Sequence, residues 1–131
     1  MSENKIVARI GSFSGPSDII KFKQKEPTRI VFNINIIGLD YSKKYTVTFM
    51  VRKKGKDVFS STPSVFGKKQ MKKINEDYVA SLKIIYDAEL EKSGIYDVKV
   101  NLVEIMEMNK KGGVGIIADT KTTSFVAEES C

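Results

Sequence analysis

Apolar and polar residues alternate with a period of two along most of this chain. The clearest example is residues 28–37, where large apolar side chains occupy every second position and asparagine fills two positions between them. A period of two places successive side chains on opposite faces of an extended chain, whereas a helix repeats its apolar residues every three or four positions. The pattern therefore predicts β-strands that each bury one face.

The same alternation predicts further strands at residues 45–51, 78–84 and 96–102. Less regular apolar runs predict a first strand near residues 5–13, a short one at Ile20 and Phe22, and a last one near 114–126. Glycine, proline, asparagine and aspartate separate these segments, as turns require. We expect the alternating residues to face one continuous core between two antiparallel sheets: Ile30, Phe32, Ile34, Ile36, Tyr45, Val47, Phe49, Leu82, Tyr96, Val98 and Val100.

The stretch from residue 60 to 77 shows no clear period. Its central residues, 67–73, are compatible with a loop or with a single helical turn. Elsewhere no strong amphipathic helix interrupts the succession of seven or eight predicted strands, which favours a sandwich or barrel over a fold of alternating helices and strands. The predicted fold class is all-β, an antiparallel β-sandwich of about seven or eight strands.

One local motif favours the sandwich. Residues 91–100 read Glu-Lys-Ser-Gly-Ile-Tyr-Asp-Val-Lys-Val, a Gly-x-Tyr turn followed by alternating valines. This segment resembles the turn into the sixth strand of immunoglobulin-like domains. The resemblance implies an immunoglobulin-like architecture in which Tyr96 is a tyrosine corner, buried and bonded through its hydroxyl to backbone near residues 88–92. The chain has no cysteine pair and no tryptophan, so the resemblance concerns architecture alone.

The length of the chain fits one ordinary domain. Its 131 residues are 41% hydrophobic and 29% charged, which is typical of a folded globular protein. We expect the domain to span residues 1–127 and residues 128–131 to form a flexible tail. The single cysteine, Cys131, cannot form an internal disulfide, and an inert thiol in a reducing compartment is favoured over an intermolecular disulfide.

The sequence predicts a cytoplasmic location, or a place inside a virus-like assembly. Its first residues contain no basic cluster followed by a long apolar run, which a secretory signal requires. The longest uncharged apolar stretch, residues 30–39, is half the length that crosses a bilayer. We therefore expect no association with a membrane.

The residue inventory argues against an enzyme. The chain has no histidine and one cysteine, which removes the usual general base near neutral pH, the common nucleophile systems and zinc. We expect no catalytic residue, metal or cofactor. Asp87, Glu89 and Glu91 suit a loose calcium site, but an exposed connection explains them more simply. Residues 112–115 are glycine-rich like a phosphate-binding turn, but a hairpin between the last two strands is the simpler interpretation.

Charge is distributed unevenly. Residues 43–73 hold ten basic side chains and one acidic one, a net charge of +9, whereas residues 74–131 hold six basic and eleven acidic ones, a net charge of −5. A positive segment of this size attracts polyanions such as nucleic acids. Against this hypothesis, the segment is rich in lysine rather than arginine, and its aromatic residues belong to the predicted core. The candidate polyanion residues are Lys53, Lys54, Lys56, Lys68, Lys69, Lys72 and Lys73.

A second candidate surface follows from residues 102–108, where apolar side chains fall on both faces of one predicted strand. One set would then lie exposed, and exposed methionine and isoleucine are typical of protein interfaces. Alternatively, the strand bends across the sandwich and buries both sets. The candidate interface residues are Val103, Ile105, Met106 and Met108.

The leading functional hypothesis is a non-catalytic module for protein binding or assembly, whose partner is another protein or a second copy of the chain. By analogy of fold and size, a phage-type structural or accessory protein would fit. One alternative is polyanion binding, with nucleic acid as the partner, through residues 43–73. Another is a carbohydrate-active enzyme with paired carboxylates, although the sequence singles out no such pair.

Overall fold

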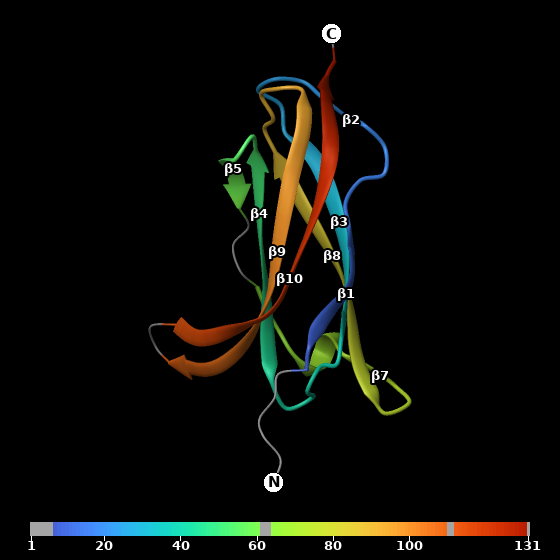
Figure 1. The fold of residues 1–131 in the computed structure, drawn as a ribbon, viewed down its shortest axis with the longest axis vertical. Coiled ribbons are helices and arrows are strands. Elements are labelled where there is room, and N and C mark those ends of the chain that lie inside the picture. The colour runs from blue at the N-terminus through green and yellow to red at the C-terminus, as the bar shows by residue number, and fades with distance from the viewer. Residues whose placement is uncertain (1–6, 61–63, 110–111, 131) are drawn as a thin grey trace.

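The computed structural model describes residues 7–60, 64–109 and 112–130, and these residues form an all-β fold (Figure 1). A single 3-10 turn, η1, spans Lys68–Gln70. No helix in the described part of the chain has the length and apolar character needed to span a bilayer. The strands, in order, are β1 (Arg9–Ser14), β2 (Ile20–Phe22), β3 (Thr28–Ile37), β4 (Lys44–Lys53), β5 (Lys56–Ser60), β6 (Ser64–Phe66), β7 (Lys72–Ile74), β8 (Asp77–Ala88), β9 (Gly94–Asn109) and β10 (Gly112–Glu129).

The strands form two sheets packed face to face (Figure 1). One has the order β1-β3-β8-β7; the other has the order β2-β10-β9-β4-β5, with β6 paired to a separate part of β4. The described pairings are antiparallel except for that between β2 and β10. The predicted antiparallel sandwich is therefore confirmed.

The core lies between the sheets and is built from the alternating residues. Of the predicted core residues, Val47 and Leu82 are half-buried and pack against the core, and the other nine are buried. Phe32 lies at the centre of the aromatic contacts, with ring centroids 5.5 Å from Phe49 and 6.1 Å from Phe125. Burial of each such ring contributes on the order of 2–3 kcal/mol.

The sequence prediction missed three short strands. Ten strands lie within the described ranges, because β5, β6 and β7 add to the seven that alternation reveals. Of residues 67–73, for which the sequence allows a loop or a single helical turn, the structure places Lys68–Gln70 in one 3-10 turn and Lys72 and Lys73 in β7. The sequences of these three strands show no clear alternation, and each strand pairs with a long neighbour, β4 or β8.

The predicted tail at residues 128–131 begins too early. Residues 128 and 129 belong to β10 and pair with Lys21 and Phe22 of β2. The N–H of Ser130 also donates to the carbonyl of Phe22 at 2.8 Å. The apolar alternation ends near Ala127, but ladder hydrogen bonds join backbone groups and continue past the last apolar side chain.

The hairpin of β9 and β10 is longer than the sandwich. Register shifts interrupt its pairing between Val114 and Gly115 and again between Ile117 and Asp119. Such bulges bend and twist a strand, and beyond them the hairpin curves away from both sheets (Figure 1). We call residues 105–117 of this hairpin the arm. At its base the Asp119 carboxylate accepts a hydrogen bond from the N–H of Ile10 at 2.8 Å, which holds β10 against β1.

Candidate binding surfaces

The arm exposes large apolar side chains. Met106 is 52% exposed, Ile116 46% and Ile117 59%. Met106 follows Glu104 on the face that the sandwich buries further along β9, whereas Ile117 pairs with Val103 on the opposite face. Among the described side chains of the arm, large apolar residues are therefore exposed on both faces.

An apolar row continues from the arm across the outer face of its sheet. Ile117 of β10 pairs with Val103 of β9, Val103 pairs with Thr46 of β4, and Thr46 pairs with Val65 of β6. Residues directly opposite one another point to the same face of a sheet. Val65 is 49% exposed, so the row is accessible at both ends. We call the arm together with Val65 and Val103 the arm surface.

A close approach of the two strands shapes this surface. At Gly115, a Cβ atom would lie 2.5 Å from Cγ1 of Val103 and 3.0 Å from the carbonyl oxygen of Glu104. Only glycine allows β10 to pass this near to β9. The two residues that follow Gly115, Ile116 and Ile117, are both exposed.

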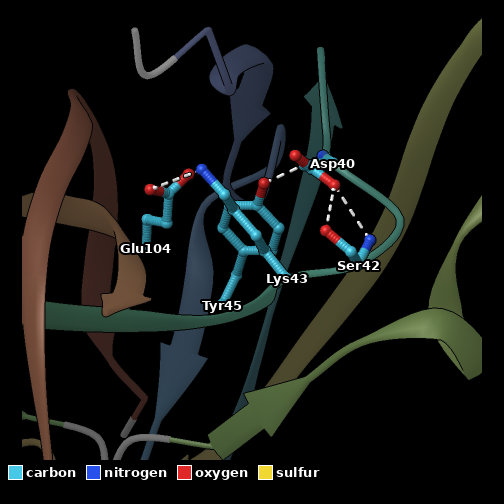
Figure 2. A network of polar contacts seen from close by, with 5 residues as sticks. All are labelled: Asp40, Ser42, Lys43, Tyr45 and Glu104. Atoms are coloured by element: carbon cyan, nitrogen blue, oxygen red, sulfur yellow. Dashed lines mark hydrogen bonds and ion pairs between the residues drawn. The ribbon is translucent and has the colours of Figure 1, made fainter. Parts of the chain in front are cut away.

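The base of the arm is fixed by a buried carboxylate. Glu104 is 2% exposed, and its carboxylate accepts a hydrogen bond from the Lys43 ammonium at 3.2 Å (Figure 2). Beside them the hydroxyl of Tyr45 accepts the N–H of Asp40 at 2.9 Å, and Asp40 in turn accepts two hydrogen bonds from Ser42 (Figure 2). The network ties the connection between β3 and β4 to the point where β9 leaves the sandwich.

Burial and charge act together on Tyr45. Desolvation raises the pKa of its phenol, and the nearby Glu104 carboxylate raises the pKa further, while the hydrogen bond from the Asp40 amide opposes both. The phenol therefore stays neutral well above ordinary pH.

The structure places the predicted interface residues at the start of the arm. Val103 and Ile105 are half-buried on the outer face, and Met106 is exposed. The side chain of Met108 lies outside the described residues. Leu102 and Glu104 are buried on the core face of β9, whereas Met106, further along the same face, is exposed.

The seven candidate lysines do not converge on one patch. Lys53, Lys54 and Lys56 lie at the turn between β4 and β5, whereas the other four lie in η1 and β7 at the opposite end of the sandwich (Figure 1). The two groups are separated by the length of β4, a strand of ten residues that spans roughly 30 Å. Charge summed along the sequence therefore overstates the charge of any one surface.

The lysines at the turn between β4 and β5, at the upper end of the sandwich in Figure 1, lie beside acidic residues. Lys53, Lys54 and Lys56 line a hollow of about 440 Å³ together with Glu89 and Glu91, which reduces its net charge. Lys53 also lies over the Tyr96 ring, 5.6 Å from the centroid.

At the other end, the lower end of the sandwich in Figure 1, two of the lysines lie over a pair of tyrosines that sequence analysis missed. Tyr41 and Tyr78 stack with ring centroids 4.8 Å apart. Lys68 lies over Tyr41 at 5.2 Å and Lys73 over Tyr78 at 5.9 Å. Beside them a hollow of about 390 Å³ is lined by Lys43, Lys44, Lys68 and Lys69 together with Tyr41 and uncharged residues. The tyrosines stand 37 residues apart in sequence, and no local pattern connects them.

Tyr96 makes the contact expected of a tyrosine corner. It is 2% exposed, and its hydroxyl donates to the carbonyl of Lys92 at 2.6 Å. Its ring stacks on Phe125 with centroids 5.2 Å apart and planes 6° apart. Burial raises the pKa of its phenol, against the smaller effect of the hydrogen bond with Lys92.

The candidate carboxylates do not form a metal centre. The Asp87 carboxylate accepts a hydrogen bond from Nε of Arg29 at 3.1 Å, and Glu89 and Glu91 are exposed. Within the described ranges no group of three histidine, cysteine, aspartate or glutamate side chains is placed to hold a metal ion. Gly112 and Gly113 pair with Asn109 and Met108, which makes them part of the hairpin, while residues 110 and 111 and Cys131 lie outside the described residues.

No family model and no curated protein matches this chain in sequence. Among solved structures it matches a bacterial adhesin from Mobiluncus mulieris that contains intramolecular disulfide, isopeptide and ester bond cross-links. Two crystal forms of that adhesin give TM-scores of 0.61 and 0.60 at 9% and 10% identity. The matches cover 94% of this chain but 57% of the adhesin chain. What the two share is the β-sandwich.

Proposed function

We propose that this protein is a non-catalytic binding module that attaches to another protein through the arm surface. The observation that carries the proposal is the projecting hairpin with isoleucine and methionine exposed on both faces. Large apolar side chains gathered on one protruding element are typical of interfaces, where their burial supplies most of the binding energy. The β-sandwich shared with an adhesin is compatible with such a role, and a place in a larger assembly stays a prediction.

The arm suits binding because polar contacts hold its base to the sandwich. The Glu104–Lys43 pair and the hydrogen bond between Ile10 and Asp119 hold both strands where they leave the core. An apolar surface on a firmly held element loses little conformational entropy on binding. We therefore expect the arm to bind without refolding the sandwich.

Site-specific photo-crosslinking in the cell of origin tests the proposal. A photoreactive residue replaces Ile117 in one variant and Ile95 in the other. These are matched positions, because both isoleucines are exposed, at 59% and 62%, on neighbouring strands of one sheet. We expect a discrete protein adduct from position 117 and none from position 95. Identical adducts from both positions, or none from either, would contradict the proposal.

A second candidate function is anion binding at the lower end of the sandwich. It rests on the hollow lined by Lys44, Lys68 and Lys69 together with Lys43, which is already paired with Glu104; the described residues that line the hollow include no acidic side chain. The neighbouring tyrosine pair supplies the aromatic surface that single-stranded nucleic acids use for stacking.

Fluorescence anisotropy with single-stranded DNA and RNA oligonucleotides tests this second candidate. It predicts binding that Lys68→Glu with Lys69→Glu abolishes, while the matched change Lys53→Glu with Lys54→Glu at the other end has little effect. Failure of the wild-type protein to bind at roughly 10 µM in low salt, where non-specific binders ordinarily bind, would eliminate it.

A further inference from the structure

The first sheet has an open edge along most of β8. On one side β8 pairs with β3 from Ala80 to Ala88, and on the other side β7 covers only residues 77–79. Among the described residues no strand pairs with the outer edge of residues 80–88. A long unpaired edge is a template for another strand, because its N–H and C=O groups lack ladder partners.

Apolar side chains lie on both faces of this edge. Ile84 and Tyr86 are half-buried and line an open cleft of about 480 Å³ between the two sheets, together with Val47 and Phe49. On the outer face Ile85 is 53% exposed. A strand added here would cover apolar surface in addition to pairing its backbone.

The outer-face sequence of the edge is complementary to itself. Lys83 and Asp87 stand two residues on either side of Ile85. When two such strands pair antiparallel about Ile85, each Lys83 lies opposite the Asp87 of the other copy, and the two Ile85 side chains face each other. A shift of the centre to Ile84 places Lys83 opposite Ile85, and a shift to Tyr86 places Asp87 opposite Ile85. The register centred on Ile85 alone joins charge to charge and apolar to apolar.

The neighbouring strand extends this complementarity. Asp87 pairs across the sheet with Arg29, and Ile85 pairs with Val31. The joined sheets would therefore carry one row of alternating charges, from Arg29 through Asp87 to Lys83 of the second copy, beside an unbroken apolar row. In the described part of the chain Lys83 has no ion-pair partner. Asp87 forms an ion pair with Arg29 on the neighbouring strand β3.

We propose that the protein forms a two-fold dimer in which the β8 edges of two copies pair antiparallel about Ile85. The partner is a second copy of this chain because, in the antiparallel register, the charged and apolar residues of the edge lie opposite matching residues of the same edge. The β8 edge belongs to the other sheet from the arm, although Val65 of the arm surface also lines the cleft beside β8. Changes at Lys83 and Asp87 test the dimer, and changes at Ile117 test the proposed function.

Complementary charge variants test the dimer. By sedimentation velocity from about 1 to 300 µM, we expect the wild-type protein to dimerise. Lys83→Asp and Asp87→Lys each place like charges opposite one another at two symmetric positions, so each alone should weaken the dimer about tenfold or more. An equimolar mixture of the two variants should recover a heterodimer. Lys121→Asp, an exposed strand lysine on the other sheet, should leave the dimer unchanged.

Cysteine cross-linking tests the register. Residues directly opposite in an antiparallel pair have Cα atoms about 4.5–5.5 Å apart, within disulfide range. In a Cys131→Ser background, Ile85→Cys should form an intermolecular disulfide on mild oxidation. Ser81→Cys, on the same face but eight residues from its counterpart in this register, should not. Circular dichroism checks that each variant is folded. A wild-type protein that stays monomeric, a mixture that fails to associate, or equal cross-linking at positions 81 and 85 would overturn the proposal.

Discussion

The two ends of the sandwich each use a buried tyrosine to hold the connection before a strand, but they use it differently. At the upper end, the Tyr96 hydroxyl donates to the Lys92 carbonyl, four residues earlier. At the lower end, the Tyr45 hydroxyl accepts from the Asp40 amide, five residues earlier, beside the buried Glu104 carboxylate. The upper contact is neutral and local, whereas the lower one adjoins an ion pair that joins residues 61 apart.

This difference matches what each end has to hold. The upper end closes the sandwich over Phe125, and ring packing with one hydrogen bond suffices for that. The lower end must also fix the point at which β9 leaves the core to form the arm. A buried carboxylate is costly unless its partner is in place, so Glu104 favours the register that brings Lys43 within reach. The cost of burying charge thereby gives positional specificity to the base of the arm.

Breaking the lower ion pair should have the largest effect. Lys43→Met leaves the Glu104 carboxylate buried without its cation, and we expect a loss of about 2–3 kcal/mol in the free energy of unfolding. Adding Glu104→Leu should restore much of that loss, because the orphaned charge is removed. Arg29→Met provides the matched control at an exposed pair and should cost less than about 1 kcal/mol. Equal losses for Lys43→Met and Arg29→Met in urea unfolding would show that burial gives the lower pair no special weight.

Replacing a glycine should cost more stability at the lower end than at the upper end, and this is the next largest expected effect. Gly38, before the Asp40 connection, has a φ of 69°, and a Cβ there would lie 2.6 Å from the Val7 carbonyl oxygen. Gly55, in the turn after β4, has a φ of 80° with open space around it. Gly55→Ala should therefore cost about 1 kcal/mol from backbone strain alone, and Gly38→Ala about 2 kcal/mol or more. Thermal unfolding of both variants measures the difference, and equal costs would argue against a tight approach at Gly38.

Removing the Tyr96 hydroxyl at the upper end should lower the free energy of unfolding by a smaller amount. Tyr96→Phe removes one hydrogen bond while keeping the ring on Phe125, so it should cost about 1 kcal/mol. Tyr41→Phe alters a tyrosine that is 43% exposed and should cost less than about half of that. If denaturant titration gives the two variants the same unfolding free energy, the corner contact is not stabilising.

Ionisation of Tyr45 and Tyr96 at alkaline pH should lower the stability of the folded protein by a small amount. Burial raises the pKa of Tyr45 and of Tyr96 in the folded protein. The unfolded chain then releases these protons first, so their stabilisation is complete below about pH 10 and is lost as pH rises through the folded pKa values. Tyr96→Phe should flatten the decline of the urea midpoint above pH 10, and an unchanged slope would remove Tyr96 as a cause.

The sequence pattern predicts those features that depend on residues close together in the chain. The strand at residues 28–37 was identified with correct bounds because its side chains are large and alternate strictly. Tyr96 was identified because its partner lies four residues away. The Tyr41–Tyr78 stack and the Glu104–Lys43 pair join residues far apart in sequence, which no local period reveals.

The candidate surfaces show the same limit. The apolar run at residues 102–108 indicates the outgoing strand of the arm. Two of the three large apolar side chains that are exposed among the arm's described residues, Ile116 and Ile117, lie on the returning strand. No local pattern marks Glu104, although it shares a face with buried Leu102. The lysines were grouped by sequence, and the length of β4 separates them.

The stability of an Ile116→Ser, Ile117→Ser double variant tests most directly whether the arm serves binding rather than folding. Because both side chains are exposed, the account predicts a free energy of unfolding within about 0.5 kcal/mol of the wild-type value. Val100→Ala, at a fully buried position of the same sheet, should by contrast cost about 1–3 kcal/mol. A loss in the double variant as large as that of Val100→Ala would show that the isoleucines belong to the folded core, and would contradict the assignment of the arm as a binding surface.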